Sequence, residues 1–403
     1  MHITLDNIFA FLILTLIMVT FMGYIIPSAY LSLTTAREHQ LEEIAQSVMD
    51  KILLNPGHPE EWGNILVAES SGDLSAFGLQ KTGGSMYELD VNKILRIAST
   101  STSMVTLPET IRIDPETIAR LLGLGHEYGF SIRITPVLNI SFRVLDRYVL
   151  KNGGGASVPK TVEAHVVTSE GRPAIGANAT GFYILMTVRR NKNEDISYLN
   201  YSYATGTVGL DGKATFSFEP LLQSIDEELK TSELKKICSA AVVYADYYGF
   251  RAVNSSVLDG GSDILKGTAV GQYLIVEFPI TEFPKGARQL ENQTGLADPP
   301  YYVYASTLHN DTNGMSGMII NKGSKKYRVY ELSNTVDDDV SLIILPAKYL
   351  GNYFTILFFR SPSDVTCHVG MASGNIKTSV LRRMVKVGSF HYTVEVRVWR
   401  WAE

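Results

Sequence analysis

Three short polar segments are the places where this sequence could do chemistry. Asp337–Asp339 and Asp259–Asp263 gather carboxylates, which are ligands that Ca²⁺ prefers in proteins. His126 and Glu127 are adjacent and form the nearest approach to a catalytic pair. Neither carboxylate segment has the regular alternation of a calcium loop, so we interpret both as solvated turns. We interpret His126-Glu127 as the turn between a helix and a strand.

Other catalytic signatures are absent from the sequence. The eight histidines are scattered, and no His-Glu-x-x-His, Cys-x-x-Cys, Gly-x-Ser-x-Gly or phosphate-loop motif occurs. The sequence therefore predicts no catalytic residue, no metal site, no cofactor and no enzyme. The net charge is −5 at pH 7 and no basic block is present, so no nucleic-acid partner is predicted either.

Six asparagines stand in Asn-X-Ser/Thr sequons, the acceptor motif of N-glycosylation. Roughly three would arise by chance in this composition, so six favours an exported chain moderately. The low charge and the many tyrosines and glycines also fit an exported, β-rich surface. The six positions are Asn139, Asn178, Asn200, Asn254, Asn292 and Asn310.

The sequence has two cysteines, Cys238 and Cys367. In an exported chain they would form one long-range disulfide that joins the middle of the chain to its last domain. Two buried thiols that serve as small apolar side chains fit the sequence equally well.

A long uncharged segment near the start of the chain precedes all the predicted domains. Asp6 and Arg37 enclose thirty residues without a Lys, Arg, Asp or Glu. This run is about twice as long as the apolar part of a signal peptide, and no basic residue precedes it. Because about 20 apolar residues cross a bilayer, the sequence predicts one transmembrane helix within residues 1–36, spanning about Ile8–Leu31. Everything from Arg37 onward is then extracellular, at the cell membrane.

The helix is predicted to continue to about Leu54, with a kink at Pro27. Its second part carries an apolar stripe at spacings of three and four, which we expect to dock on the globular head. That stripe consists of Leu41, Ile44, Ala45, Val48, Met49 and Ile52. Small or polar positions in the first part, which could support contacts between helices, are Thr15, Thr20, Gly23 and Ser28.

The remaining chain alternates short helices with many strands, which predicts a mainly β protein. Asp90 and Asp114-Pro115 have the form of helix starts, and the segment after Phe130 alternates as a strand. The predicted parts are a helix and α/β head at 37–150, a flexible linker at 151–159, a β module at 160–284 and a further β domain at 285–403. Strands and turns in the module, including Ser169–Pro173 and Leu210–Phe216, resemble immunoglobulin-like sandwiches of surface proteins.

Several short motifs resemble the archaeal pilin-like membrane proteins, which are relatives of type IV pilins. They follow the long hydrophobic helix in order, and the resemblance covers about residues 5–142, with a second patch at 382–401. The motifs are Leu53–Gly63, Phe77–Leu79, Tyr87–Lys93 and Glu127–Phe130. The resemblance implies that Asp6 contacts the N-terminus of a neighbouring subunit. An ordinary helix N-cap is the alternative for this residue.

The final segment alternates Val394, Val396 and Val398 with polar or aromatic residues, so it predicts a strand with one buried face. The head looks short of strands, and we therefore expect this strand to return to it. The module would then be an insertion between two parts of one domain. The alternative is three domains in a row.

Two functions fit these features. The first is a structural, pilin-like cell-surface subunit that is anchored or assembled through its hydrophobic helix. The alternative is a single-pass surface stalk or adhesin that does not polymerise. The expected partners are the membrane, copies of the chain or other pilin-like subunits, and cell-surface proteins or glycans.

Overall fold

The computed structural model describes most of the chain, and all structural statements concern those residues. They are residues 5–64, 74–98, 100–101, 111–191, 194–259, 264–276, 303–304, 318–322, 325–331, 342–349, 352–360, 362, 364–370 and 377–401.

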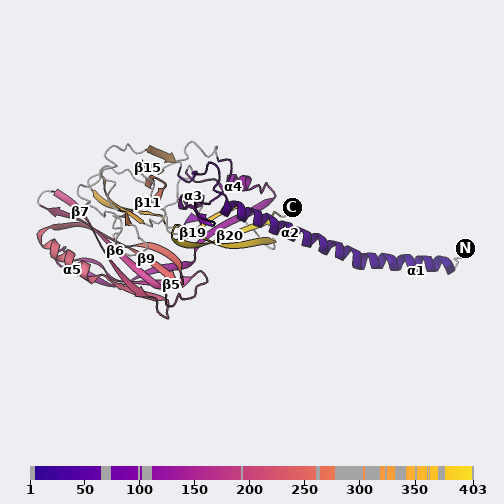
Figure 1. Ribbon diagram of the computed structural model, residues 1–403, viewed down its shortest axis with the longest axis horizontal. Helices are drawn as coiled ribbons and strands as arrows, with labels where there is room; N and C mark the ends of the chain where they lie inside the picture. The colour runs from indigo at the N-terminus through magenta and orange to yellow at the C-terminus, as the bar shows by residue number, and fades with distance from the viewer. Residues whose placement is uncertain are drawn as a thin grey trace.

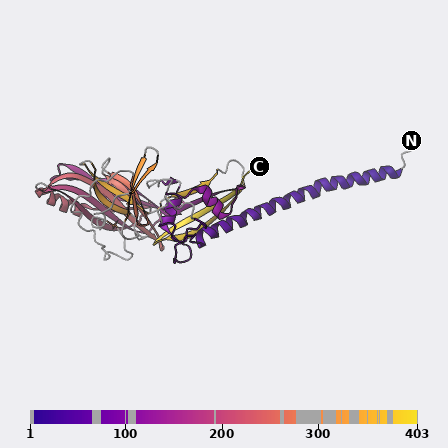
Figure 2. The ribbon, with the colours of Figure 1, turned by 90° about the horizontal axis from the view of Figure 1, so that it is seen from above.

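A helical rod projects from one end of the molecule and carries the N-terminus at its far tip (Figures 1 and 2). It consists of α1 (Leu5–Thr20), a π-helical turn η1 (Phe21–Ile25) and α2 (Ile26–Leu54). Pro27 offers no N–H to the carbonyl of Gly23, which lies within η1, so the helical irregularity falls next to the predicted kink.

The predicted transmembrane span is wrong. No helix among the described residues is both long enough and apolar enough to cross a membrane. α1 contains 16 residues, which span about 24 Å against the roughly 30 Å of a bilayer core. The longer α2 carries charged residues from Arg37 onward. The mainly β fold agrees with the sequence, whereas the span over Ile8–Leu31 and the placement in the cell membrane do not.

The end of α2 packs on a six-stranded sheet, and together they form the head. The predicted stripe is largely correct, because Ala45, Val48, Met49 and Ile52 are buried in its core. The sheet order is β1 (Glu88–Leu89), β19 (Thr378–Val387), β20 (Phe390–Arg400), β3 (Tyr128–Pro136), β18 (Val365–Val369) and β2 (Thr100–Ser101).

Two short helices complete the head, and both begin where the sequence predicted. Before α3 (Val91–Ile97), the Asp90 carboxylate accepts hydrogen bonds from the backbone N–H of Asn92 and Lys93. Before α4 (Pro115–Leu122), Asp114 accepts from Thr117 N–H at 3.2 Å. Each cap satisfies donors that the first turn of a helix leaves unpaired.

The C-terminal strand returns to the head, as predicted. β20 lies between β19 and β3, and it pairs antiparallel with β3 from Tyr392 opposite Pro136 to Arg400 opposite Tyr128. Its buried face includes Val394, Val396 and Val398. β18, β19 and β20 therefore belong to the head rather than to a separate domain over 285–403.

Between β3 and β18 the chain first builds a two-sheet sandwich. The segment predicted as a linker is instead the turn of the β4–β5 hairpin, since β5 already begins at Ala156. The three-stranded sheet contains β4 (Leu138–Leu150), β5 (Ala156–Thr168) and β8 (Lys213–Ser217). The four-stranded sheet contains β10 (Phe250–Asp259), β9 (Glu233–Tyr247), β6 (Asn178–Asn191) and β7 (Glu194–Thr207). A short helix, α5 (Glu219–Glu228), and the 3-10 turn η2 (Leu229–Thr231) precede β9.

A seven-stranded sheet contributes a further layer. Alternate residues of β6 serve two cores: Tyr183 and Leu185 face the sandwich core, whereas Ile184 and Met186 belong to the core that includes this sheet. Such a strand is apolar on both faces because both faces are covered. The sheet order is β13 (Val303–Tyr304), β16 (Leu342–Tyr349), β17 (Asn352–Phe359), β11 (Ile264–Val270), β12 (Tyr273–Val276), β15 (Lys325–Glu331) and β14 (Met318–Lys322).

Candidate functional site

The most exposed apolar surface among the described residues lies on the helical rod. The large apolar side chains that the structure describes between Phe9 and Leu31 are more than half exposed, and Tyr24 reaches 78%. A fully buried side chain of this kind gains about 1.5–3 kcal/mol over an exposed one. The exposed set comprises Phe9, Phe11, Leu12, Ile13, Leu14, Leu16, Ile17, Met18, Val19, Phe21, Met22, Tyr24, Ile26, Tyr30 and Leu31.

Two threonine hydroxyls on this rod are bonded to the backbone of the rod itself. The hydroxyl of Thr15 donates to the Phe11 carbonyl at 2.7 Å, and that of Thr20 donates to the Leu16 carbonyl at 2.8 Å. A polar side chain that bonds its own helix adds no demand for water. These two hydroxyls therefore do not oppose the burial of α1 against an apolar partner. Asp6 lies in the first turn of α1, and its contact with a neighbouring subunit stays a prediction.

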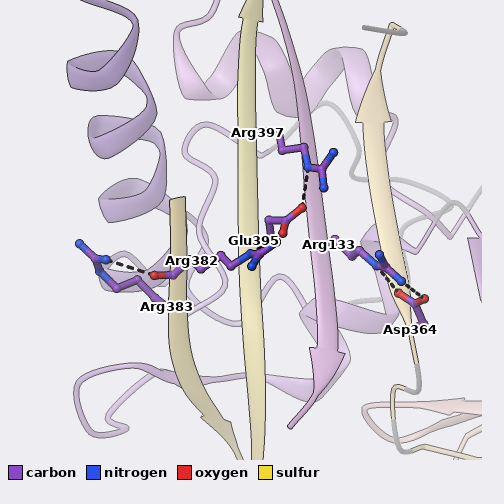
Figure 3. Close-up of polar contacts among 6 residues, drawn as sticks. All are labelled: Arg133, Asp364, Arg382, Arg383, Glu395 and Arg397. Carbon is purple, nitrogen blue, oxygen red and sulfur yellow. Dashed lines mark hydrogen bonds and ion pairs between the residues drawn. The ribbon is translucent and has the colours of Figure 1, made fainter. Parts of the chain in front are cut away.

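A second surface, which we call the arginine face, covers the side of the head sheet opposite α2. It consists of the outward side chains of Arg133, Val380, Arg382, Met384, Lys386, Glu395 and Arg397. Glu395 lies at its centre and accepts hydrogen bonds from Arg397 at 2.5 Å and Arg382 at 2.6 Å (Figure 3).

The same row continues to the neighbouring strands. Arg133 on β3 forms a bidentate pair with Asp364, just before β18, at 3.1 and 2.8 Å (Figure 3). Asp364 raises the pKa of Arg133 by hydrogen bonding and by its charge. Because Glu395 is shared by two arginines and Lys386 adds a further cation, the arginine face carries more positive than negative charge. The sequence showed the alternation of β20 but not these cross-strand partners.

Glu395 makes the stability of the head depend on pH. Burial raises the pKa of its carboxyl, but the hydrogen bonds and charges of Arg397 and Arg382 outweigh burial, so the pKa is lowered overall. A lowered folded-state pKa contributes stability that is present above the ordinary value of about 4.3 and is lost as pH falls through the folded-state value.

We therefore expect Glu395→Gln to flatten the fall in the free energy of unfolding below about pH 5, where the wild type loses this contribution. Urea unfolding followed by tryptophan fluorescence measures it, and Glu170→Gln, at an exposed turn of the sandwich, is the matched control. Identical pH profiles for Glu395→Gln and the wild type would contradict the assignment.

The segments singled out for chemistry do not converge on one site. Glu127 forms an ion pair with Arg400 at 3.3 Å, which ties the helix-to-strand turn to β20. Asp259 pairs with Arg147 on the sandwich, while residues 260–263 and Asp337–Asp339 lie outside the described residues. Within the described part of the chain, no three His, Cys, Asp or Glu residues are grouped to hold a metal ion.

The structure describes four of the six sequon asparagines, and they differ in their exposure to solvent. Asn139 and Asn178 are exposed at the starts of β4 and β6, whereas Asn200 is half-buried on β7. Asn254 donates its amide nitrogen to the Ile140 carbonyl at 2.6 Å, so the group that would carry a glycan is already bonded. The structure thus favours Asn139 and Asn178 as acceptors. Asn292 and Asn310 lie outside the described residues.

Both cysteines are buried and no disulfide joins them, so the second interpretation agrees with the structure. Cys238 lies on β9 of the sandwich, and Cys367 lies on β18 of the head. Burial raises the pKa of the Cys367 thiol to about 12, which leaves it protonated and unreactive at neutral pH.

No protein-family model matches the sequence, and no curated protein is similar to it.

Proposed function

We propose that the protein is a structural subunit that assembles, through its N-terminal helix, with copies of itself or with similar subunits. The observation that carries this proposal is the exposed apolar surface formed by the described side chains of the rod between Phe9 and Leu31. Contiguous apolar surfaces of such extent mark interaction sites in proteins.

The distribution of apolar residues around the rod favours several partners. Consecutive residues such as Leu12, Ile13 and Leu14 point in directions about 100° apart, and all three are exposed. An amphipathic helix would need one partner, whereas a helix that is apolar all round is buried on all sides. A bundle of rods, each surrounded by others, satisfies this requirement.

The attachment of the rod to the head also suits a structural role. α2 continues without a break into the head, where Met49, Ile52 and Leu53 are fully buried. Lys51 adds a hydrogen bond to the Leu122 carbonyl at 2.8 Å. A rod held in this way fixes the position of the head relative to its neighbours.

We expect Leu12→Gln combined with Leu16→Gln and Val19→Gln to convert assemblies of the full chain into single protomers. Three apolar side chains then lose the about 1.5–3 kcal/mol each that burial would contribute. Sedimentation velocity measures the size, and tryptophan fluorescence checks that the head stays folded.

Gly23→Leu distinguishes specific packing between rods from non-specific hydrophobic aggregation. A Cβ at Gly23 meets nothing within 4 Å in the protomer, so the substitution is free of clashes there. It adds apolar surface, which would increase non-specific aggregation, but it obstructs a close contact between rods. We expect smaller assemblies. A wild-type chain that sediments as single protomers, or a triple variant that assembles as well as the wild type, would contradict the proposal.

A further inference from the structure

The arginine face is an open surface with a net positive charge. The side chains of Arg382 and Arg397 are 67% and 49% exposed although both bond Glu395. Val380 and Met384, which flank Arg382 on β19, are 44% and 48% exposed. The face therefore combines exposed cations with exposed apolar side chains, which is the composition of an interaction surface rather than of a purely solvated one.

An acidic groove lies on the opposite side of the head, along the outer side of α2. It has a volume of about 600 Å³, and its lining includes Glu43, Ser47, Asp50 and Leu54. These positions recur at spacings of three and four and form one stripe of the helix. Leu54 is 43% exposed. Lys51 also lines the groove and keeps its positive charge, although its ammonium group is directed to the Leu122 carbonyl, so the ionised lining residues carry a net charge of −1.

The two surfaces are complementary in charge and in apolar content. The cations of the arginine face match Glu43 and Asp50, and exposed Met384 matches exposed Leu54. Because α2 packs on one side of the sheet and the arginine face occupies the other, the two surfaces point away from each other. One copy can therefore dock its arginine face into the groove of a second copy while its own groove stays open.

We propose that the heads bind one another in this way, arginine face to acidic groove of the next copy. The proposal rests on the proposed function and names a second contact within the same assembly. Because the contact joins two different surfaces, it can repeat from each copy to the next. Unless the rotation between neighbouring copies closes a ring, such a contact builds a filament. The rods supply apolar attraction, and the heads fix the register.

The two contacts differ in their response to salt. The Debye length shortens from about 8 Å at 0.15 M to about 3 Å at 1 M ionic strength, which weakens attraction between exposed charges. Apolar burial between rods is not weakened in this way. High salt therefore separates the contact between heads from the contact between rods.

The test uses two full-length chains mixed in equal amounts, one carrying Met384→Cys and the other Leu54→Cys. Under mild oxidation we expect a disulfide-linked dimer in the mixture and little from either chain alone. Neither native thiol is exposed. We expect the yield to fall in 1 M NaCl, while sedimentation shows that the rods remain assembled.

Charge reversal then identifies the contact. Glu43→Lys with Asp50→Lys in the Leu54→Cys chain should lower the yield by at least about tenfold, because like charges across an interface cost several kcal/mol. Arg382→Glu with Lys386→Glu in the Met384→Cys chain should do the same, and it leaves Arg397 bonded to Glu395. Mixing the two reversed chains should restore the dimer.

Arg383→Glu in the Met384→Cys chain is the matched control, since this neighbouring arginine lies on the other face of β19 (Figure 3 shows it directed away from Glu395). It reaches Gln46, which lines that chain's own groove, and that groove takes no part in the cross-link to the Leu54→Cys chain. This variant should leave the yield unchanged. A normal assembly without the Met384–Leu54 cross-link would overturn this inference and leave the proposed function standing. If the wild-type chain does not assemble and the mixed cysteine variants do not cross-link, both fail.

Discussion

Val396→Asp is expected to unfold the head. Val396 is fully buried in the centre of β20, opposite Ile132 of β3 and Leu381 of β19. An aspartate there would place a carboxylate in the apolar core without a partner, and substitutions of this kind cost several kcal/mol. Because a domain is stable by only about 5–15 kcal/mol, we expect a loss of more than about 4 kcal/mol to unfold a substantial fraction of the molecules.

The three tryptophans make this loss measurable. Trp62, Trp399 and Trp401 all lie in the head, so tryptophan fluorescence during urea unfolding reports on the head alone. Val380→Asp is the matched control, because Val380 is on the neighbouring strand but 44% exposed. A Val396→Asp chain with the wild-type urea midpoint would show that β20 is not part of the head core.

Phe216→Ala is expected to have the second largest effect, and in a different place. Phe216 is 1% exposed in the sandwich core and covers Gly181 so closely that a Cβ there would lie 2.8 Å from its ring. Removing the ring leaves a cavity that the rigid strands cannot fill, which costs about 3–5 kcal/mol. We expect faster hydrogen exchange in β5, β6 and β8.

Hydrogen exchange with mass spectrometry measures this effect strand by strand. Leu210→Ala is the control, since Leu210 is 83% exposed in the turn before β8. Because the sandwich has its own core, the tryptophan signal of the head should change less than the exchange of the sandwich strands. Unchanged exchange in Phe216→Ala would contradict the assigned packing.

Local features are predictable from the sequence where one short segment contains all the information. The apolar stripe of α2, the caps at Asp90 and Asp114, and the buried face of β20 each follow from residues a few positions apart. The return of β20 was also predictable, because a strand with one apolar face needs a sheet to cover it.

Other features depend on distant partners or on subtle backbone geometry. The π-helical turn at Phe21–Ile25 divides an apolar run that looks continuous in the sequence, and the predicted span failed there. Arg133 and Asp364 are 231 positions apart, so only the strand register reveals their pair. The segment 151–155 has the composition of a linker but serves as a hairpin turn, because strands on both sides pair with each other.

The order of strands in the head also determines when the head sheet can form during synthesis. β3 ends at Pro136, whereas its neighbour β20 begins at Phe390, so 253 residues must be synthesised between them. At about 5–20 residues per second, this takes roughly 13–50 s on the ribosome. During that interval the sandwich can fold, but the head sheet lacks its central strand and the stripe of α2 has no complete surface to pack on. The contact proposed between heads therefore cannot form before β20 has been synthesised, because the arginine face needs β19, β20 and β3 in one sheet.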